Sequence, residues 1–370
     1  MRPTRLIPVI LLILLVAACG SAPKKAVQTS PIATGVEPVL TGPAGARTYM
    51  ERGNNAARTN DWKRAEENYS KAIKTNPRLA EGYYNRGVAR LKLGNNEAAA
   101  KDMRAALQLR RNYQPAVINL GAAYLATGRL TAAAQQFNAV AKRNPNNLEA
   151  KNNLGAVYMR MRRYDQAEGV FKEIIRRDYK FVAAHVNLGL LYFYKGKPEL
   201  AERIFKNAQK LDPQNADLAA NYGYMLIELG EIGLGEAQLK TALRVDPNNS
   251  EALTNLGSLE IMLKRFDRAL MHLERSVQID PSNPHAWVNL GISRRTKGDA
   301  AGAETAYKRA IQIDPKMAEA YLNYGILLEQ VRGDKQAAIA QYSRYWQVAG
   351  RRKNANQRVP DWVRALKKGK

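Results

Sequence analysis

Glycine recurs along this chain at a fixed interval of 34 residues, from Gly53 to Gly325. Asparagine stands two residues before each glycine from the second onward, at Asn85, Asn119, Asn153, Asn187, Asn221, Asn255, Asn289 and Asn323. Prolines follow the same interval at six places between Pro77 and Pro315. A period of this length is typical of a solenoid of helical hairpins, in which each repeat packs on its neighbours. Such an array grows in one dimension, so 370 residues need no single large core.

The shared residue pattern is clearest in the repeat at 182–215. It contains Leu188, Gly189, Tyr192, Gly196, Ala201, Phe205, Ala208 and Pro213. Small residues let the two helices of a hairpin approach closely, and the glycine at the end of the first helix suits a left-handed cap. This pattern resembles the tetratricopeptide repeat and covers nine repeats over residues 46–348. The resemblance implies an all-α, right-handed superhelix with a C-terminal capping helix.

The N-terminus resembles the signal peptide of a bacterial lipoprotein. Arg2 and Arg5 precede an apolar run from Leu6 to Ala18, which is too short to span a bilayer and suits a signal peptide at residues 1–18. The run ends Val-Ala-Ala before Cys19, the only cysteine of the chain. In that family the cysteine receives a diacylglyceryl group and its new amine is acylated, for example with palmitate, which anchors the protein firmly.

The resemblance also implies a location. No aspartate follows Cys19, so we expect a lipid-anchored protein on the periplasmic face of the outer membrane. Residues 19–45 are rich in Pro, Gly, Ser and Thr, and we expect them to be the lipidated N-terminus and a flexible linker.

The C-terminal segment 349–370 is predicted to be a basic cap. Trp362, Val363 and Leu366 follow a proline and would dock on the last repeat as a helix. Arg351–Lys370 contains eight basic residues and one acid. This segment is either a solvated tail or a contact with an anionic envelope surface or acidic partner.

Neither catalysis nor a cofactor is predicted. The sequence has no metalloprotease, nucleophile-elbow or phosphate-loop motif. The three histidines are separated in the repeats, and His185 falls at a packing position of a first helix, where a buried histidine with a satisfied ring is expected. We therefore expect no metal site, no cofactor and no enzymatic activity.

The concave groove of such a superhelix is the predicted binding site. The eight asparagines share one inward position, and an amide can both donate to and accept from a peptide backbone. This arrangement resembles the asparagine ladder of the tetratricopeptide domain of O-GlcNAc transferase, although asparagine is also tolerated there as a simple polar residue. Apolar side chains between the asparagines would complete the groove: Tyr84, Ile118, Val186, Leu190, Phe193, Tyr194, Tyr224, Ile261, Met262 and Ile292. Such a patch either contacts a partner or packs between neighbouring repeats.

The net charge of +25 would ordinarily indicate nucleic acid as a partner, but an exported protein does not meet it. We expect a protein partner with an extended or acidic segment. Outer-membrane lipoproteins built of these repeats include type IV pilus pilotins, which guide a secretin subunit, and TadD-like proteins of Flp pili. The chain resembles them, and this implies a scaffold in pilus or secretin assembly. The alternatives are an NlpI-like adaptor for peptidoglycan hydrolases and a scaffold of an exopolysaccharide exporter.

Overall fold

The computed structural model describes residues 41–350 together with residues 359, 361, 363 and 364. Every regular element within these residues is an α-helix, which confirms the predicted fold class. The signal peptide, Cys19 and most of the predicted linker lie outside the described residues.

The eighteen helices of the described chain alternate in pairs. We call the first helix of each pair the A helix and the second the B helix. The A helices are α1 (Gly42–Arg58), α3 (Ala80–Lys92), α5 (Gln114–Ala126), α7 (Leu148–Arg160), α9 (Val182–Tyr194), α11 (Ala216–Glu228), α13 (Ser250–Met262), α15 (Pro284–Thr296) and α17 (Ala318–Gln330). The B helices are α2 (Trp62–Thr75), α4 (Asn96–Leu109), α6 (Leu130–Arg143), α8 (Tyr164–Arg177), α10 (Pro198–Leu211), α12 (Ile232–Val245), α14 (Phe266–Ile279), α16 (Ala300–Ile313) and α18 (Lys335–Ala349).

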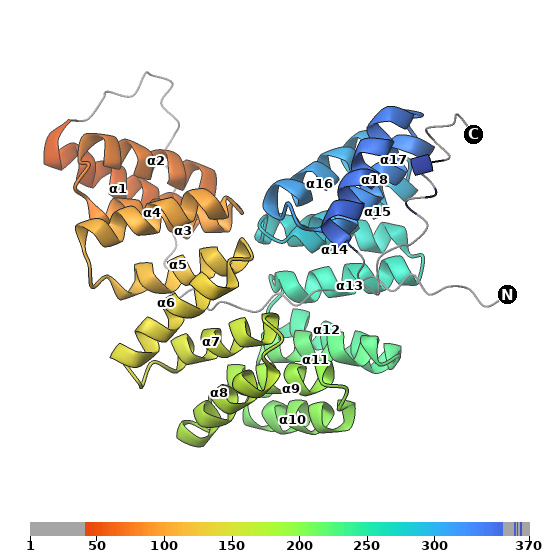
Figure 1. Ribbon diagram of the computed structural model, residues 1–370, viewed down its shortest axis with the longest axis horizontal. Coiled ribbons are helices and arrows are strands. Elements are labelled where there is room, and N and C mark those ends of the chain that lie inside the picture. Colours follow the sequence, from red (N-terminus) through yellow and green to blue (C-terminus); the bar gives the residue numbers. More distant parts are fainter. Residues whose placement is uncertain (1–40, 351–358, 360, 362, 365–370) are drawn as a thin grey trace. The chain divides into compact units, whose positions relative to one another are not determined.

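The described chain divides into two compact units, with the division inside α8. We call residues 41–170 the N-unit and the described residues from 171 onward the C-unit. Apart from α8, for which no contact is described, the helices of each hairpin pack on each other within a unit, and each B helix that has an A helix after it also packs on that helix (Figure 1). Successive A helices touch as well: α3 contacts α5, and α9, α11, α13, α15 and α17 contact one another in order. We call the side formed by these helices the A-helix face.

The glycines of the 34-residue series make room for the bulky side chain of the B helix. A Cβ atom added at Gly121 would lie 2.8 Å from Phe137 Cζ, and one added at Gly189 would lie 2.8 Å from Phe205 Cε2. Both phenylalanines are fully buried. The close approach predicted from the sequence is therefore confirmed, and the cost of glycine inside a helix is offset by buried aromatic surface.

The turn from A helix to B helix requires a left-handed residue in every repeat. Gly94, Gly128, Gly196, Gly230, Gly298 and Gly333 adopt this conformation, with φ between 70° and 89°. Three repeats place another residue there: Asn60, Arg162 and Lys264 have φ of 58–60°. The sequence predicted the glycine turns but not these three, because the repeat register constrains the backbone whether or not the residue suits it.

Two boundaries differ from the sequence prediction. Helix α1 begins at Gly42, so residues 42–45 belong to the first hairpin and not to the linker at 19–45. Pro43 occupies the first turn, where proline is compatible with a helix, and Gly45 is already buried. At the other end, α18 extends to Ala349, one residue past 348.

Part of the C-terminal segment is described, and it covers the last hairpin. Val359 is helical and fully buried, and it belongs to the apolar cluster of Tyr321, Tyr324 and Tyr342. Val363 packs against the same cluster, as predicted for a capping helix. Trp362 and Leu366 lie outside the described residues. In the described part of the chain, no helix combines the length and the apolar character needed to cross a bilayer.

Candidate functional site

The predicted asparagine ladder lies on the A-helix face, and most of it is covered. Asn119, Asn153, Asn187, Asn221 and Asn255 are buried, whereas Asn85, Asn289 and Asn323 are partly exposed. The sequence places these residues at one helical position but cannot show that the neighbouring A helix covers that position.

Several ladder amides form hydrogen bonds within the protein. The Nδ2 atom of Asn85 donates to Asn54 Oδ1 at 3.2 Å, that of Asn119 donates to the Tyr84 hydroxyl at 3.2 Å, and that of Asn289 donates to Ser258 Oγ at 2.6 Å. Each of these bonds joins an A helix to the A helix before it. The ladder therefore links successive hairpins, and these donors are not directed only at a bound segment. Binding of a peptide backbone by the ladder stays a prediction.

The amide nitrogen of Asn153 has another environment. This atom is buried and has no hydrogen-bond partner. Asn323 donates to the carbonyl oxygen of Glu319 within its own helix at 2.9 Å. The ladder is therefore uniform in sequence but not in its contacts.

The predicted apolar groove residues likewise differ in their exposure to solvent. Val186, Leu190 and Tyr224 are buried, with Leu190 only 1% exposed. Tyr84 and Phe193 are partly buried, and Tyr194 is 37% exposed. Of the two alternatives that the sequence left open, packing between neighbouring repeats describes these three buried residues. The physical reason is that the close contacts of α9 with α11 and of α11 with α13 cover their inward-facing side chains.

One row of side chains does reach solvent at the end of the A helices in the C-unit. Tyr194, Glu228 and Met262 are the last residues of α9, α11 and α13, which pack side by side. We call these three residues the helix-end row. Met262 is 47% exposed, and Leu229, which follows Glu228, is 40% exposed. Tyr194 and Met262 were among the predicted groove residues and Glu228 was not, although the 34-residue spacing of all three is visible in the sequence.

Aromatic packing supports the exposed tyrosine of this row. The ring of Phe193 lies 5.3 Å from that of Tyr194 and meets the ring of Tyr224 edge-on at 6.4 Å. The hydroxyl groups of Tyr194 and Tyr224 are 3.4 Å apart. Tyr194 is therefore held by its neighbours while part of its ring remains open to solvent.

Two carboxylates stand at the opposite end of the same helices. Asp217 and Glu251 are the second residues of α11 and α13, and we call them the acid pair. Asn249 Nδ2 donates to Asp217 Oδ1 at 2.7 Å, and Asn221 Nδ2 approaches Glu251 Oε2 at 3.4 Å. Neither carboxylate forms an ion pair with a lysine, arginine or histidine in the described chain.

The charged forms of the two carboxylates in the acid pair are unfavourable because both groups are buried and lie near each other. Burial, together with the negative charge of Asp217, raises the pKa of Glu251 to about 8. Burial also raises the pKa of Asp217 above its ordinary value. A carboxylate removed from water without a cation nearby favours its neutral form. A positive group from outside the chain would reverse this tendency.

The N-unit shows the opposite arrangement. Arg86 binds Asp102 with two hydrogen bonds of 2.9 and 2.8 Å, and Arg90 donates to Asp102 at 2.9 Å and to Glu66 at 2.7 Å. The Asp102 side chain is only 3% exposed. Its buried charge is thus fully compensated by residues of the N-unit itself.

The A helices of the two units differ in charge throughout. Those of the first four repeats hold the basic residues Arg47, Arg52, Arg58, Arg86, Arg90, Lys92, Lys151 and Arg160 and the acidic residues Glu51, Glu81 and Glu149. Those of the last five repeats hold the acidic residues Asp217, Glu228, Glu251, Glu260, Glu319 and Glu329 and the basic residues Arg294 and Arg295. The chain as a whole is strongly basic, but the A helices of the C-unit carry more acidic than basic residues.

The histidines are structural where the structure defines their contacts. His185 is buried, and its Nε2 atom lies 2.9 Å from the carbonyl oxygen of Tyr179, so the predicted satisfied histidine is confirmed. Trp287 and Tyr321 hold the equivalent position in their A helices and donate to the carbonyl oxygens of Pro281 and Pro315. In the described residues, no three His, Cys, Asp or Glu side chains gather as metal ligands would.

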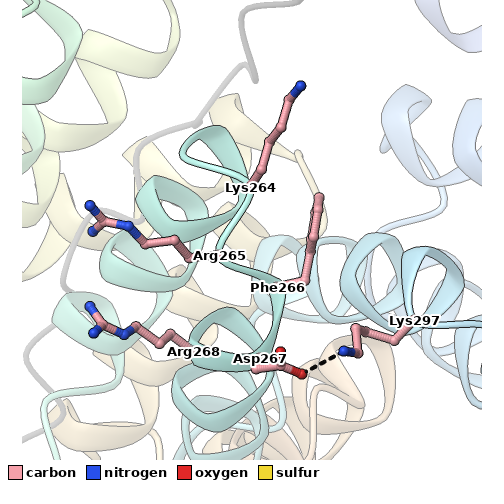
Figure 2. A pocket seen from close by; sticks show the side chains of 6 residues that line it. All are labelled: Lys264, Arg265, Phe266, Asp267, Arg268 and Lys297. Atoms are coloured by element: carbon pink, nitrogen blue, oxygen red, sulfur yellow. Dashed lines mark ion pairs between the residues drawn. The ribbon is translucent and has the colours of Figure 1, made fainter.

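A surface cavity of about 440 Å³ lies at the turn between α13 and α14. It is lined by Lys264, Arg265, Phe266, Asp267, Arg268 and Lys297. Figure 2 shows that the two arginines point to one side, away from Lys297, whose Nζ atom pairs with Asp267 at 2.8 Å. Because these cations do not converge on one point, the cavity does not form an anion site.

Comparisons with known proteins agree with the fold. Profiles of the tetratricopeptide repeat match residues 50–117, 118–180, 152–216 and 288–350, and related profiles of the same repeat match 192–259 and 250–283. No curated protein sequence matches the chain.

Solved structures are similar to the chain at low sequence identity, and those with a TM-score above 0.5 share its fold. The Cut9–Hcn1 hetero-tetramer of the APC/C contains a chain that is 13% identical, with a TM-score of 0.55 over 87% of this chain and 76% of that one. A tetratricopeptide repeat protein from Parabacteroides merdae is 19% identical, with a TM-score of 0.51 over 67% of this chain and 98% of its own. PilF from Pseudomonas aeruginosa is 20% identical, with a TM-score of 0.48 over 58% of this chain and 96% of its own.

Proposed function

The chain belongs to the tetratricopeptide-repeat family, and we propose that it is a non-enzymatic, periplasm-facing lipoprotein scaffold that binds an extended protein segment on its A-helix face. A tetratricopeptide-repeat array is suited to protein–protein interaction. The observation that carries this proposal is the helix-end row of the C-unit, where Tyr194 and Met262 are exposed at the ends of α9 and α13, the two A helices that pack on either side of α11. Large apolar side chains held open to solvent at equivalent positions favour a protein partner.

The binding surface is tested by removing its apolar side chains. The double variant Tyr194→Ser, Met262→Ser should lose its partner in a crosslinked pull-down identified by mass spectrometry, because both side chains would be buried in the complex. The matched control is Leu234→Ser, Met271→Ser, which removes two side chains that are 58% and 60% exposed on B helices of the same unit. Equal recovery of the partner by both variants would contradict the proposed surface.

The lipid anchor at Cys19 is the second part of the proposal. It is supported by the apolar run that precedes this single cysteine and by the lack of an aspartate after it. Cys19→Ser should release the protein from outer-membrane fractions into the soluble periplasm, because no thioether to the lipid can form. Persistence of the variant in outer-membrane fractions would show that another feature attaches the protein.

We propose that this scaffold acts in type IV or Flp pilus assembly, with a secretin subunit as its partner. The support is the combination of a lipoprotein-like N-terminus with an array of these repeats, as in pilotins. Deletion of the gene should abolish the SDS-resistant secretin multimer. A normal multimer in the deletion strain would exclude the pilotin role and leave the scaffold role open.

A further inference from the structure

The helix-end row and the acid pair lie at opposite ends of the same A helices. In α11, Asp217 is the second residue and Glu228 is the last, so about 16.5 Å of helix separates them. An extended segment of about five residues covers that distance. One short segment can therefore contact both features at the same time.

The two features have different chemistry. At the helix-end row, Tyr194 and Met262 offer apolar surface on either side of Glu228, whose pKa is raised by burial. At the acid pair, Asp217 and Glu251 receive amide hydrogen bonds from Asn249 and Asn221 and have no cation beside them in the described chain. The first feature favours a large apolar side chain, and the second favours a positive one.

The neighbourhood of the acid pair excludes an acidic occupant. Asp246 and Asp280 add further negative charge near Asp217 and Glu251. A glutamate or aspartate placed here would meet like charges in a poorly solvated site, whereas a lysine or arginine would meet two carboxylates. The charge of this face is thus complementary to a basic segment, in contrast to the basic composition of the whole chain.

We propose that the A-helix face formed by α9, α11 and α13 binds an extended polypeptide segment in which a lysine or arginine lies within about five residues of a large apolar residue. This inference rests on the proposed function, because it assigns the chemistry of the partner to the same surface. The basic side chain lies between Asp217 and Glu251, and the apolar side chain lies on Tyr194 and Met262. Burial raises the pKa of both carboxylates, and a cation bound between them would favour their charged forms.

The experiment selects random peptides displayed on phage against the full chain in detergent. Selected peptides should be enriched in a Lys or Arg close to a Leu, Ile, Phe or Trp. They should bind the variant Asp217→Asn, Glu251→Gln about tenfold more weakly, since neither substituted side chain can ionise beside a bound cation while the shape is kept. The control variant Glu199→Gln, Glu231→Gln neutralises two exposed carboxylates at B helices of the same unit and should bind as the parent does.

The outcomes separate this inference from the proposed function. Peptides without a basic residue, or equal binding by the Asp217→Asn, Glu251→Gln variant, would overturn the basic partner and leave the scaffold standing. Failure to select any peptide would overturn both. Self-association of the parent that the double variant abolishes, measured by light scattering, would show a second copy of the chain as the occupant and would also overturn the inference. Circular dichroism of both variants establishes that the helices are intact.

Discussion

The N-unit and the C-unit are built from the same hairpin but present opposite charge on their A helices. In the N-unit the buried Asp102 is enclosed by Arg86 and Arg90, so its charge is compensated internally. In the C-unit the acid pair has no cation beside it in the described chain, and Tyr194 and Met262 are open to solvent. The residues that recur every 34 positions therefore determine the architecture of both units. The residues that differ from repeat to repeat determine what each unit can bind.

The largest expected effect is the loss of the compensated charge in the N-unit. Asp102→Ala leaves the partly buried Arg86 without a carboxylate and Arg90 with Glu66 alone, and it should reduce the local stability of α3 and α4 by about 3 kcal/mol. Hydrogen exchange of those helices measures this, because a repeat array does not have to unfold as one unit. Glu81→Ala is the control, since its pair with Arg110 is more than half exposed and is worth at most about 1 kcal/mol.

A loss below about 1 kcal/mol for Asp102→Ala would contradict the contrast between the two units. It would show that the arginines of the N-unit do not depend on their carboxylate. The two A-helix faces would then differ in composition but not in how their charges are compensated.

Because no cation lies beside Glu251 in the described chain, the stability of the C-unit should depend on pH. Glu251 has a folded-state pKa of about 8 against an ordinary value of 4.5, so the folded protein binds more protons than the unfolded chain between these values. Stability should therefore fall as pH rises from about 5 to about 8, by on the order of 2 kcal/mol for α13. Glu251→Gln should remove most of this dependence and be the more stable protein above pH 8.

Urea unfolding of the parent and of Glu251→Gln across that pH range measures the difference. Parallel loss of stability in the two proteins would show that Glu251 is already ionised at neutral pH. The acid pair would then carry its full charge, and its environment would be more polar than its burial indicates.

The smallest expected change in stability comes from the left-handed turn residues, and it should have the same sign in both units. Arg162 in the N-unit and Lys264 in the C-unit occupy left-handed turn positions that glycine fills in most other repeats. Arg162→Gly and Lys264→Gly should each stabilise the local hairpin by about 0.5–1 kcal/mol, because glycine removes the steric cost but adds entropy to the unfolded chain. Thermal unfolding measures both variants, and opposite signs in the two units would mean that the units differ in backbone architecture as well as in charge.

The sequence predicted the hairpins well because glycine at one position and a bulky residue sixteen positions later, such as Gly121 and Phe137, have a direct steric meaning. It left open whether Val186, Leu190 and Tyr224 line a groove or pack between repeats, since their burial depends on contacts between A helices that are 34 residues apart. The acid pair was visible as an acidic residue at equivalent positions of two successive repeats. Its significance was not visible, because it depends on which cations lie nearby in three dimensions.

The most direct measurement is site-specific photo-crosslinking in cells, with a crosslinking amino acid at Tyr194 and, as the control, at Leu234 on the B helix α12. The crosslinked peptide is then sequenced by mass spectrometry. The expected result is one protein captured from Tyr194 and not from Leu234, through a segment with a lysine or arginine close to a large apolar residue. Capture of the same proteins from both positions, or of an acidic segment at Tyr194, would contradict a C-unit whose acidic A-helix face binds a basic, apolar partner.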